Sequence, residues 1–251
     1  MNVAFPTWLP SARHRVLDLL FPPRCICCRA DLTEVKQHAS ICSTCFGQLQ
    51  LTAWPTCRRC ASRVPEIPGP VDECGHCRED RLQFERAIAL GSYEGLLGEL
   101  IVRMKYDRNE RLASTLATLI LSELGEVIRE LQVDGIVPVP MVPWRRLARG
   151  TNSPAALAAL VGRELGVPVF PRVLQYRRKP SQQKGLSRSG RFRNMRNLIF
   201  AKAGYPLEAS HVLLVDDILT TGATCSEAAR ALKQAGAAQA SVLVAGRTPS
   251  S

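Results

Sequence analysis

Two adjacent carboxylates and a group of hydroxyl side chains lie within one short stretch of the sequence. Asp216 and Asp217 follow the apolar run 212–215, and the small residues Thr220, Thr221, Gly222, Ala223 and Thr224 come soon after. The short apolar run contains β-branched residues and predicts a buried parallel strand. The segment from Ser226 to Gly236 predicts a helix that ends at the glycine. We therefore expect a strand, an acidic pair, a turn and a helix in that order.

This order of residues suits a sugar phosphate. Backbone N–H groups at a turn that opens a helix carry positive partial charge and bind phosphate. Gly222 permits close approach of the backbone, and the threonine hydroxyls add donors. Carboxylates at the carboxyl end of a central strand lie where open α/β sheets bind ligands. We expect the acids to take ribose hydroxyls and the turn to hold a 5′-phosphate. A polar strand exit without a ligand is the alternative.

The segment 212–224 resembles, along its whole length, the phosphoribosyl-diphosphate (PRPP) motif of type I phosphoribosyltransferases. The resemblance implies that Asp216 and Asp217 bind the ribose 2′- and 3′-hydroxyls with Mg²⁺ nearby, and that 220–224 hold the 5′-phosphate. Enzymes of this class that act on 6-oxopurines carry an aspartate where this chain has Thr220. The resemblance therefore disfavours hypoxanthine and guanine as substrates.

Eight of the ten cysteines form four C-x-x-C pairs, and the second two pairs repeat the first two with a shift of 32 residues. The pairs are Cys25/Cys28, Cys42/Cys45, Cys57/Cys60 and Cys74/Cys77. Each half offers four thiolates at the spacing of a structural zinc site, which predicts two Zn²⁺ ions bound in tandem. Disulfides, a redox role and ligation across the two halves are the alternatives. The regular pairing, the equal spacing within each half and a cytoplasmic setting argue against them. We interpret Cys27, His76 and Cys225 as non-ligands.

The composition changes near Leu82 to that of an α/β domain. Strands are expected over 87–92 and 134–139, and helices over the segment that ends at Lys105 and over 110–131. Their alternation predicts a parallel sheet flanked by helices. We predict a leader with a short amphipathic helix over 1–24, a double zinc ribbon over 25–80, and an α/β domain of the type I phosphoribosyltransferase class over 82–251.

Positive charge is concentrated between Met141 and Phe200. Thirteen residues of this segment are Lys or Arg and only Glu164 is acidic, so the segment accounts for the net charge of +11 of the whole chain. Such concentration predicts a polyanion at this face, either a sugar diphosphate or a nucleic-acid backbone. A solvated basic loop is the alternative.

The sequence contains no apolar run close to the roughly 18 residues of a membrane span. It also lacks a secretory cleavage pattern near its start. We therefore expect a cytoplasmic protein that is not inserted in a membrane.

Four further patterns resemble the ComF family, whose members pair a zinc ribbon with a phosphoribosyltransferase-like domain. They are the Val-Pro-Val-Pro-Met run 137–141, Arg149-Gly150-x-Asn152, Gln183-x-x-Leu186 and Arg191-x-x-Asn194. Tyr93 and Lys105 fit the same family, and bacterial members are linked to competence and the use of external DNA. The resemblance implies that Arg149 and Gly150 meet diphosphate ahead of a helix capped by Ser153. It also implies that 179–193 form a mobile hood over the site.

These residues predict binding of Mg²⁺–PRPP between Asp216/Asp217 and the basic loops, followed by phosphoribosyl transfer with release of diphosphate. Mg²⁺ and Arg149 or Lys105 would offset the developing charge. No residue specifies the acceptor. The alternative is a non-catalytic protein that binds PRPP or single-stranded DNA on its basic face. In that case the zinc ribbons would dock DNA-uptake proteins.

Overall fold

The computed structural model describes residues 23–32, 40–52, 55–66, 69–106, 111–142, 151–178 and 185–249. Its centre is a four-stranded sheet with the order β1-β6-β5-β2, in which every neighbouring pair is parallel. The strands are β1 (Arg86–Ser92), β2 (Gly135–Pro138), β5 (His211–Leu219) and β6 (Gln239–Arg247). The expected strands 87–92 and 134–139 correspond to β1 and β2.

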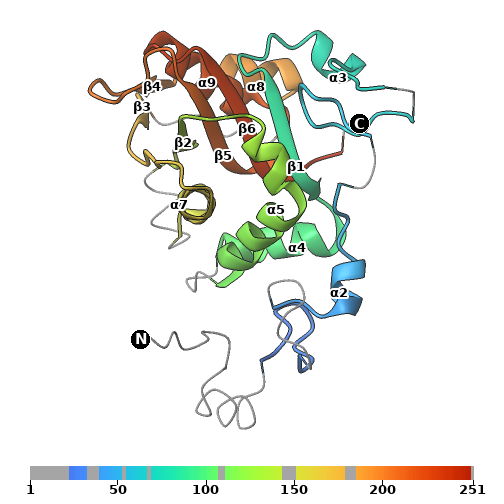
Figure 1. Ribbon diagram of the computed structural model, residues 1–251. Helices are drawn as coiled ribbons and strands as arrows, with labels where there is room; N and C mark the ends of the chain where they lie inside the picture. Colours follow the sequence, from blue (N-terminus) through green and yellow to red (C-terminus); the bar gives the residue numbers. More distant parts are fainter. Residues whose placement is uncertain are drawn as a thin grey trace, which may run out of the picture.

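Helices cover both faces of this sheet (Figure 1). One face packs against α4 (Gly95–Met104), α5 (Arg111–Arg129) and α7 (Ser153–Leu165). The other packs against α9 (Ala223–Gln234). Strands buried on both faces need apolar residues at successive positions, as in the run 212–215 of β5. The predicted α/β architecture, a parallel sheet flanked by helices beside a small N-terminal cysteine-rich region, is confirmed.

The two cysteine-rich repeats pack on opposite faces of the sheet. The first ribbon (25–45) includes the start of α2 (Ser43–Gly47). It places Cys25 and Cys45 in the core shared with α4 and α5. The second ribbon (57–77), which leads into α3 (Gly75–Arg78), places its four cysteines in the core shared with α9. Figure 1 shows the separation, with α2 near α4 and α3 near α8.

A small subdomain connects α7 to β5. The strands β3 (Leu174–Tyr176) and β4 (Ile199–Ala201) pair antiparallel, and α8 (Arg188–Met195) lies between them in sequence. Both α8 and β4 contact α9. No pattern in the sequence predicted β3, β4 or α8 as separate elements. Of the expected hood 179–193, residues 185–193 are described and 179–184 lie outside the described residues.

Two boundaries differ from expectation at the acidic stretch. The strand β5 continues to Leu219 instead of ending at the acidic pair, because β6 pairs with it as far as Arg247, whereas β2 pairs only with 212–215. The helix α9 begins at Ala223, three residues earlier than expected, since Gly222 adopts a φ of +84° and serves as its N-cap. Thr224 therefore lies in the first helical turn.

None of the helices in the described ranges is long and apolar enough to cross a lipid bilayer. Of the predicted leader with its amphipathic helix (1–24), residues 1–22 lie outside the described residues.

Candidate functional site

Asp216 and Asp217 sit at the carboxyl end of β5, beyond the point where β2 stops pairing with it. Successive side chains of a strand point to opposite faces, so the two carboxylates have different surroundings. Oδ2 of Asp217 lies 3.2 Å from Nζ of Lys105, on the α4 face. Oδ2 of Asp216 lies 3.8 Å from Sγ of Cys225, on the α9 face. The pair thus brings the predicted Lys105 to the acidic strand end.

The Asp216 carboxyl is partly buried, and its Oδ1 accepts a 2.8 Å hydrogen bond from the backbone N–H of Asp217. Burial, and after it the charge of Asp217, raise the pKa of Asp216 to about 8. A raised pKa next to an open strand end is typical of carboxylates that meet a cation or a donor when a ligand binds.

The residues Thr220 to Thr224 form a tight connection from β5 into the N-terminus of α9. The first helical hydrogen bond runs from the N–H of Ser226 to the carbonyl of Gly222, 2.7 Å long. The N–H groups before it therefore have no acceptor within the helix. Oγ1 of Thr221 accepts from the N–H of Ala223 at 3.4 Å. Backbone N–H groups at the positive end of a twelve-residue helix favour a bound anion.

An open groove of about 530 Å³ runs beside this turn. Its lining combines two threonines of the turn with cationic side chains from α8 and from the end of β6, including Thr220, Thr221, Arg188, Arg191 and Arg247. The groove therefore places hydroxyl donors and positive charge on one surface, as an anionic ligand requires.

Arg149 and Gly150, predicted to meet diphosphate, lie outside the described residues. The helix that follows them is α7, and its N-cap is Asn152 rather than the expected Ser153. Asn152 makes no capping hydrogen bond with its side chain, and Pro154 at the second helical position has no N–H to offer. Oγ1 of Thr151 donates to the carbonyl of Lys105 at 3.0 Å, so this helix start adjoins Lys105.

The eight cysteines of the C-x-x-C pairs form two separate clusters. Cys25, Cys28, Cys42 and Cys45 make one and Cys57, Cys60, Cys74 and Cys77 the other, each with sulfurs within 4.8 Å of one another. Zn–S bonds of about 2.3 Å in a tetrahedron place the sulfurs about 3.8 Å apart. The Cys28–Cys42 and Cys60–Cys74 sulfur pairs are 3.7 and 3.6 Å apart. The residues therefore fit zinc, and the prediction of tandem rather than crossed clusters is confirmed.

The 32-residue repeat is visible in the backbone as well. The N–H of Arg29 donates to the carbonyl of Cys25, and the N–H of Ala61 donates to that of Cys57, both at 2.8 Å. Arg29 and Ala61 have φ values of +65° and +56°. Cys27 and His76 belong to neither cluster, in agreement with their interpretation as non-ligands. Burial raises the pKa of the Cys27 thiol to about 12.

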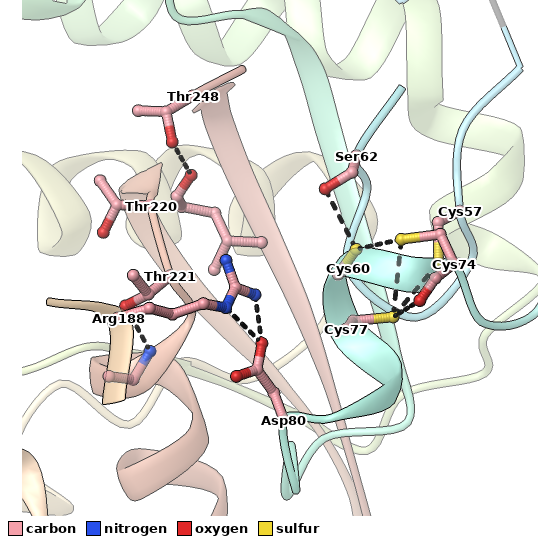
Figure 2. A network of polar contacts seen from close by, with 12 residues as sticks. Cys57, Cys60, Ser62, Cys74, Cys77, Asp80, Arg188, Thr220, Thr221 and Thr248 are labelled. Carbon is pink, nitrogen blue, oxygen red and sulfur yellow. Dashed lines mark hydrogen bonds and ion pairs between the residues drawn. The ribbon is translucent and has the colours of Figure 1, made fainter. Parts of the chain in front are cut away.

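Sequence reasoning missed two groups that adjoin the turn. Arg247, at the end of β6, is buried and donates to the carbonyl of Thr220 at 2.6 Å. Asp80, just beyond the second ribbon, forms an ion pair with Arg188 of α8 (Figure 2). Asp80 and Arg188 are 108 positions apart, and Arg247 bonds to a backbone carbonyl, which every residue type has. No local sequence pattern could therefore have revealed either contact.

Comparison with known proteins gives consistent matches. Residues 16–79 match the double zinc ribbon domain family. The chain is 31% identical over 219 residues to competence protein F of Haemophilus influenzae, which covers 85% of this chain and 92% of that protein. It is 31% identical over 233 residues to the DNA utilization protein YhgH of Escherichia coli K12, which covers 92% of this chain and 99% of that protein.

Among solved structures, an adenine phosphoribosyltransferase matches with 19% identity and a TM-score of 0.35, over 55% of this chain and 72% of that one. The two relatives at 31% identity each extend over more than four fifths of this chain and more than nine tenths of their own length. The chain therefore belongs to the competence protein F (ComF) family.

Proposed function

We propose that this protein binds PRPP together with Mg²⁺ and transfers the phosphoribosyl group to an acceptor with release of diphosphate. The observation that carries the proposal is the arrangement on one strand end: β5 bears Asp216 and Asp217 and then leads through Thr220–Thr224 directly into the N-terminus of α9. Carboxylates for ribose hydroxyls and N–H groups for a 5′-phosphate are thereby spaced along a few consecutive residues.

Each end of PRPP would meet a different set of groups. The turn and the groove with Arg188 and Arg191 would hold the 5′-phosphate. Lys105, together with Arg149 and Gly150, would face the diphosphate. The two carboxylates offer the hard oxygen ligands that Mg²⁺ prefers, and the ion would supply charge neutralisation for the diphosphate. Lys105 would stabilise negative charge on the leaving group, and its ion pair with Asp217 at the strand end supports this role.

The relatives suggest the biological setting. Their names, a competence protein and a DNA utilization protein, support a role for this chain in the uptake or use of external DNA. We propose the division into a leader (1–24), a double zinc ribbon (25–80) and a phosphoribosyltransferase-like domain (82–251), with the ribbons available for partners of the uptake machinery. A reducing compartment such as the cytoplasm would keep the thiolates available for zinc.

Calorimetric titration of Mg²⁺–PRPP into the zinc-loaded protein tests the proposal. The wild type should bind, and the Asp216→Asn/Asp217→Asn double variant should not. Asp72→Asn is the control, because the Asp72 side chain is 79% exposed in the second ribbon and leaves the strand end untouched. Diphosphate release should then appear with at least one acceptor in a screen of bases and amines. Absence of PRPP binding by the wild type would refute the proposed function.

The alternative is a binding protein for single-stranded DNA, which the cationic lining of the groove favours. Phosphate contacts to a single strand make binding fall steeply with salt, with a slope of about −0.7 per phosphate neutralised. A steep salt dependence with single-stranded DNA, combined with no response to PRPP, would support this alternative over the enzyme.

A further inference from the structure

The second ribbon is connected to the candidate phosphate turn by one buried side chain. Arg247, the last residue of β6, is 6% exposed. Its Nε donates to the carbonyl of Cys60 at 2.8 Å, and its Nη2 donates to Oγ of Ser62 at 2.7 Å. Its Nη1 donates to the carbonyls of Leu219 at 3.1 Å and Thr220 at 2.6 Å. A single guanidinium thus joins the second ribbon, at Cys60 and Ser62, to the residues at the start of the turn, Leu219 and Thr220.

The charge of this guanidinium needs compensation. Within the described ranges, every hydrogen bond that Arg247 donates goes to a carbonyl or hydroxyl oxygen, and none goes to a carboxylate. Isolated buried charges are costly. Four thiolates around one zinc ion carry a net negative charge, whereas four protonated thiols carry none. The metal-loaded cluster is therefore a negative group close enough to favour a buried Arg247.

The Ser62 hydroxyl links the cysteine cluster to the Arg247 guanidinium. Oγ of Ser62 lies 3.2 Å from Sγ of Cys60, and Figure 2 shows the Ser62 hydroxyl pointing at that sulfur. When Cys60 binds a metal as a thiolate, the Ser62 hydroxyl can donate to the sulfur while its oxygen accepts from Arg247. Hydrogen bonds of this kind orient metal ligands and respond to loss of the metal.

A second connection starts from the same ribbon. The N–H of Asp80 donates to the carbonyl of Cys77 at 3.1 Å, and the Asp80 side chain is only 11% exposed. Its Oδ2 accepts from Nε of Arg188 at 2.7 Å, which fixes the start of α8 (Figure 2). Arg188 and Thr221 line the same groove. The second ribbon is therefore linked to two sides of the groove, to the turn through Arg247 and to α8 through Asp80 and Arg188.

The first ribbon has a different neighbourhood. Nη2 of Arg103 in α4 donates to the carbonyl of Ile26 at 2.9 Å, on the opposite face of the sheet. Among the described residues, those that line the groove include none from the first ribbon. The two ribbons have the same backbone hydrogen bonds around their first cysteine pair, but they contact different parts of the α/β domain.

We propose that Arg247 is a positioning residue through which the metal-loaded second ribbon sets the affinity of the Thr220–Thr224 turn for a phosphate group. The inference rests on the proposed function, which supplies the phosphate. The first ribbon does not take part in this coupling. Loss of metal from the second ribbon would weaken ligand binding at the turn while the diphosphate end of the site keeps its affinity.

Two probes separate the two ends of the site in calorimetric titrations of the full chain. Mg²⁺–PRPP engages both ends, and Mg²⁺–diphosphate engages only the end at Lys105. Arg247→Lys keeps the charge but loses the fork of donors, and we expect about tenfold weaker PRPP binding with unchanged diphosphate binding. Arg230→Lys is the matched control, because Arg230 is a largely buried arginine of α9 that pairs with Glu227 away from the groove.

Two milder or more direct variants complete the test. Ser62→Ala, which decides the matter if Arg247→Lys does not fold, should retain two zinc ions and bind PRPP about threefold more weakly. Cys77→Ser should lose one zinc ion and show the selective loss of PRPP affinity. Cys45→Ser, in the first ribbon, should lose one zinc ion and bind PRPP as the wild type does.

The outcomes are distinct. If the wild type binds no PRPP, the proposed function fails and the coupling fails with it. If the wild type binds PRPP and the Arg247 and Ser62 variants bind it equally well, the coupling alone is overturned. Equal losses of PRPP and diphosphate affinity would mean a general structural defect and would also overturn it.

Discussion

Lys105 and Asp217 form an ion pair with a separation of 3.2 Å between Nζ and Oδ2, and their side chains are only 13% and 12% exposed. The pair joins the residue that caps the end of α4 to the carboxyl end of β5. The Lys105 ammonium also lies 5.9 Å from the centre of the Tyr93 ring, which adds a weak attraction for the cation. The two charges are thus held in place before any ligand arrives.

Removal of Lys105 or Asp217 alone should destabilise the protein, because the remaining charge would be buried without a partner. We expect Lys105→Met to lower the free energy of unfolding by about 2–3 kcal/mol at pH 7, because Asp217 then remains buried without its cation. The double variant Lys105→Met/Asp217→Asn should recover to within about 1 kcal/mol of the wild type. Urea denaturation of the four proteins of this cycle measures the coupling. Additive losses in the double variant would contradict the prediction.

The pKa of Asp216 predicts a pH-dependent stability. Its value of about 8 in the folded protein lies above the usual 3.8, so the folded state binds the proton more tightly than the unfolded state does. The stability that this group contributes is therefore present at low pH and is lost as the pH rises toward 8. In Asp216→Asn the loss disappears, because the amide carries no charge at any of these pH values.

Thermal unfolding at several pH values tests whether the stability falls as the pH rises. The gain in stability of Asp216→Asn over the wild type should be larger at pH 9 than at pH 5, with about 2–4 °C in Tm for each kcal/mol gained. The exposed control Asp72→Asn should show no such trend. A difference in Tm between Asp216→Asn and the wild type that stays constant with pH would show that Asp216 is already ionised at pH 5.

Local patterns were sufficient for the metal clusters and the acidic stretch. Zinc ligation by C-x-x-C pairs is local in sequence, so the repeat from Cys25 to Cys77 predicted both clusters correctly. The strand and helix around Asp216 were also predicted, but their boundaries were not. The pairing of Leu219 with Arg247 extends β5, and the left-handed φ of Gly222 starts α9 early; both depend on tertiary context.

Contacts between distant segments could not be predicted. Arg247 and Cys60 are 187 residues apart, and the acceptor is a backbone carbonyl that every residue type possesses. The placement of the two ribbons on opposite faces of the sheet depends on which apolar residues each ribbon buries. The cysteine spacing is the same in both halves and contains no information on this difference.

The opposite placement of the ribbons predicts separate patterns of local stability. Loss of zinc should unfold a ribbon of this size, because its structure depends on the metal. In hydrogen exchange, Cys45→Ser should reduce protection in α4 and α5, which share a core with the first ribbon. Cys77→Ser should instead reduce protection in α8 and in 219–224. The same set of deprotected peptides in both variants would contradict the assignment of each ribbon to one face.

Gly222 gives a test that separates backbone strain from ligand contact. Its φ is +84°, and a Cβ there would lie 3.3 Å from Cδ2 of Leu82 and 3.6 Å from Cζ of Phe84. Gly204 has a φ of +90° with no atom near its Cβ direction, so Gly204→Ala carries the same backbone strain away from the turn. Each alanine should lower the free energy of unfolding by about 1–2 kcal/mol. Only Gly222→Ala should also weaken PRPP binding, because it displaces the N–H groups that would hold the phosphate. Equal PRPP affinity in the two variants would mean that the phosphate is held elsewhere in the groove.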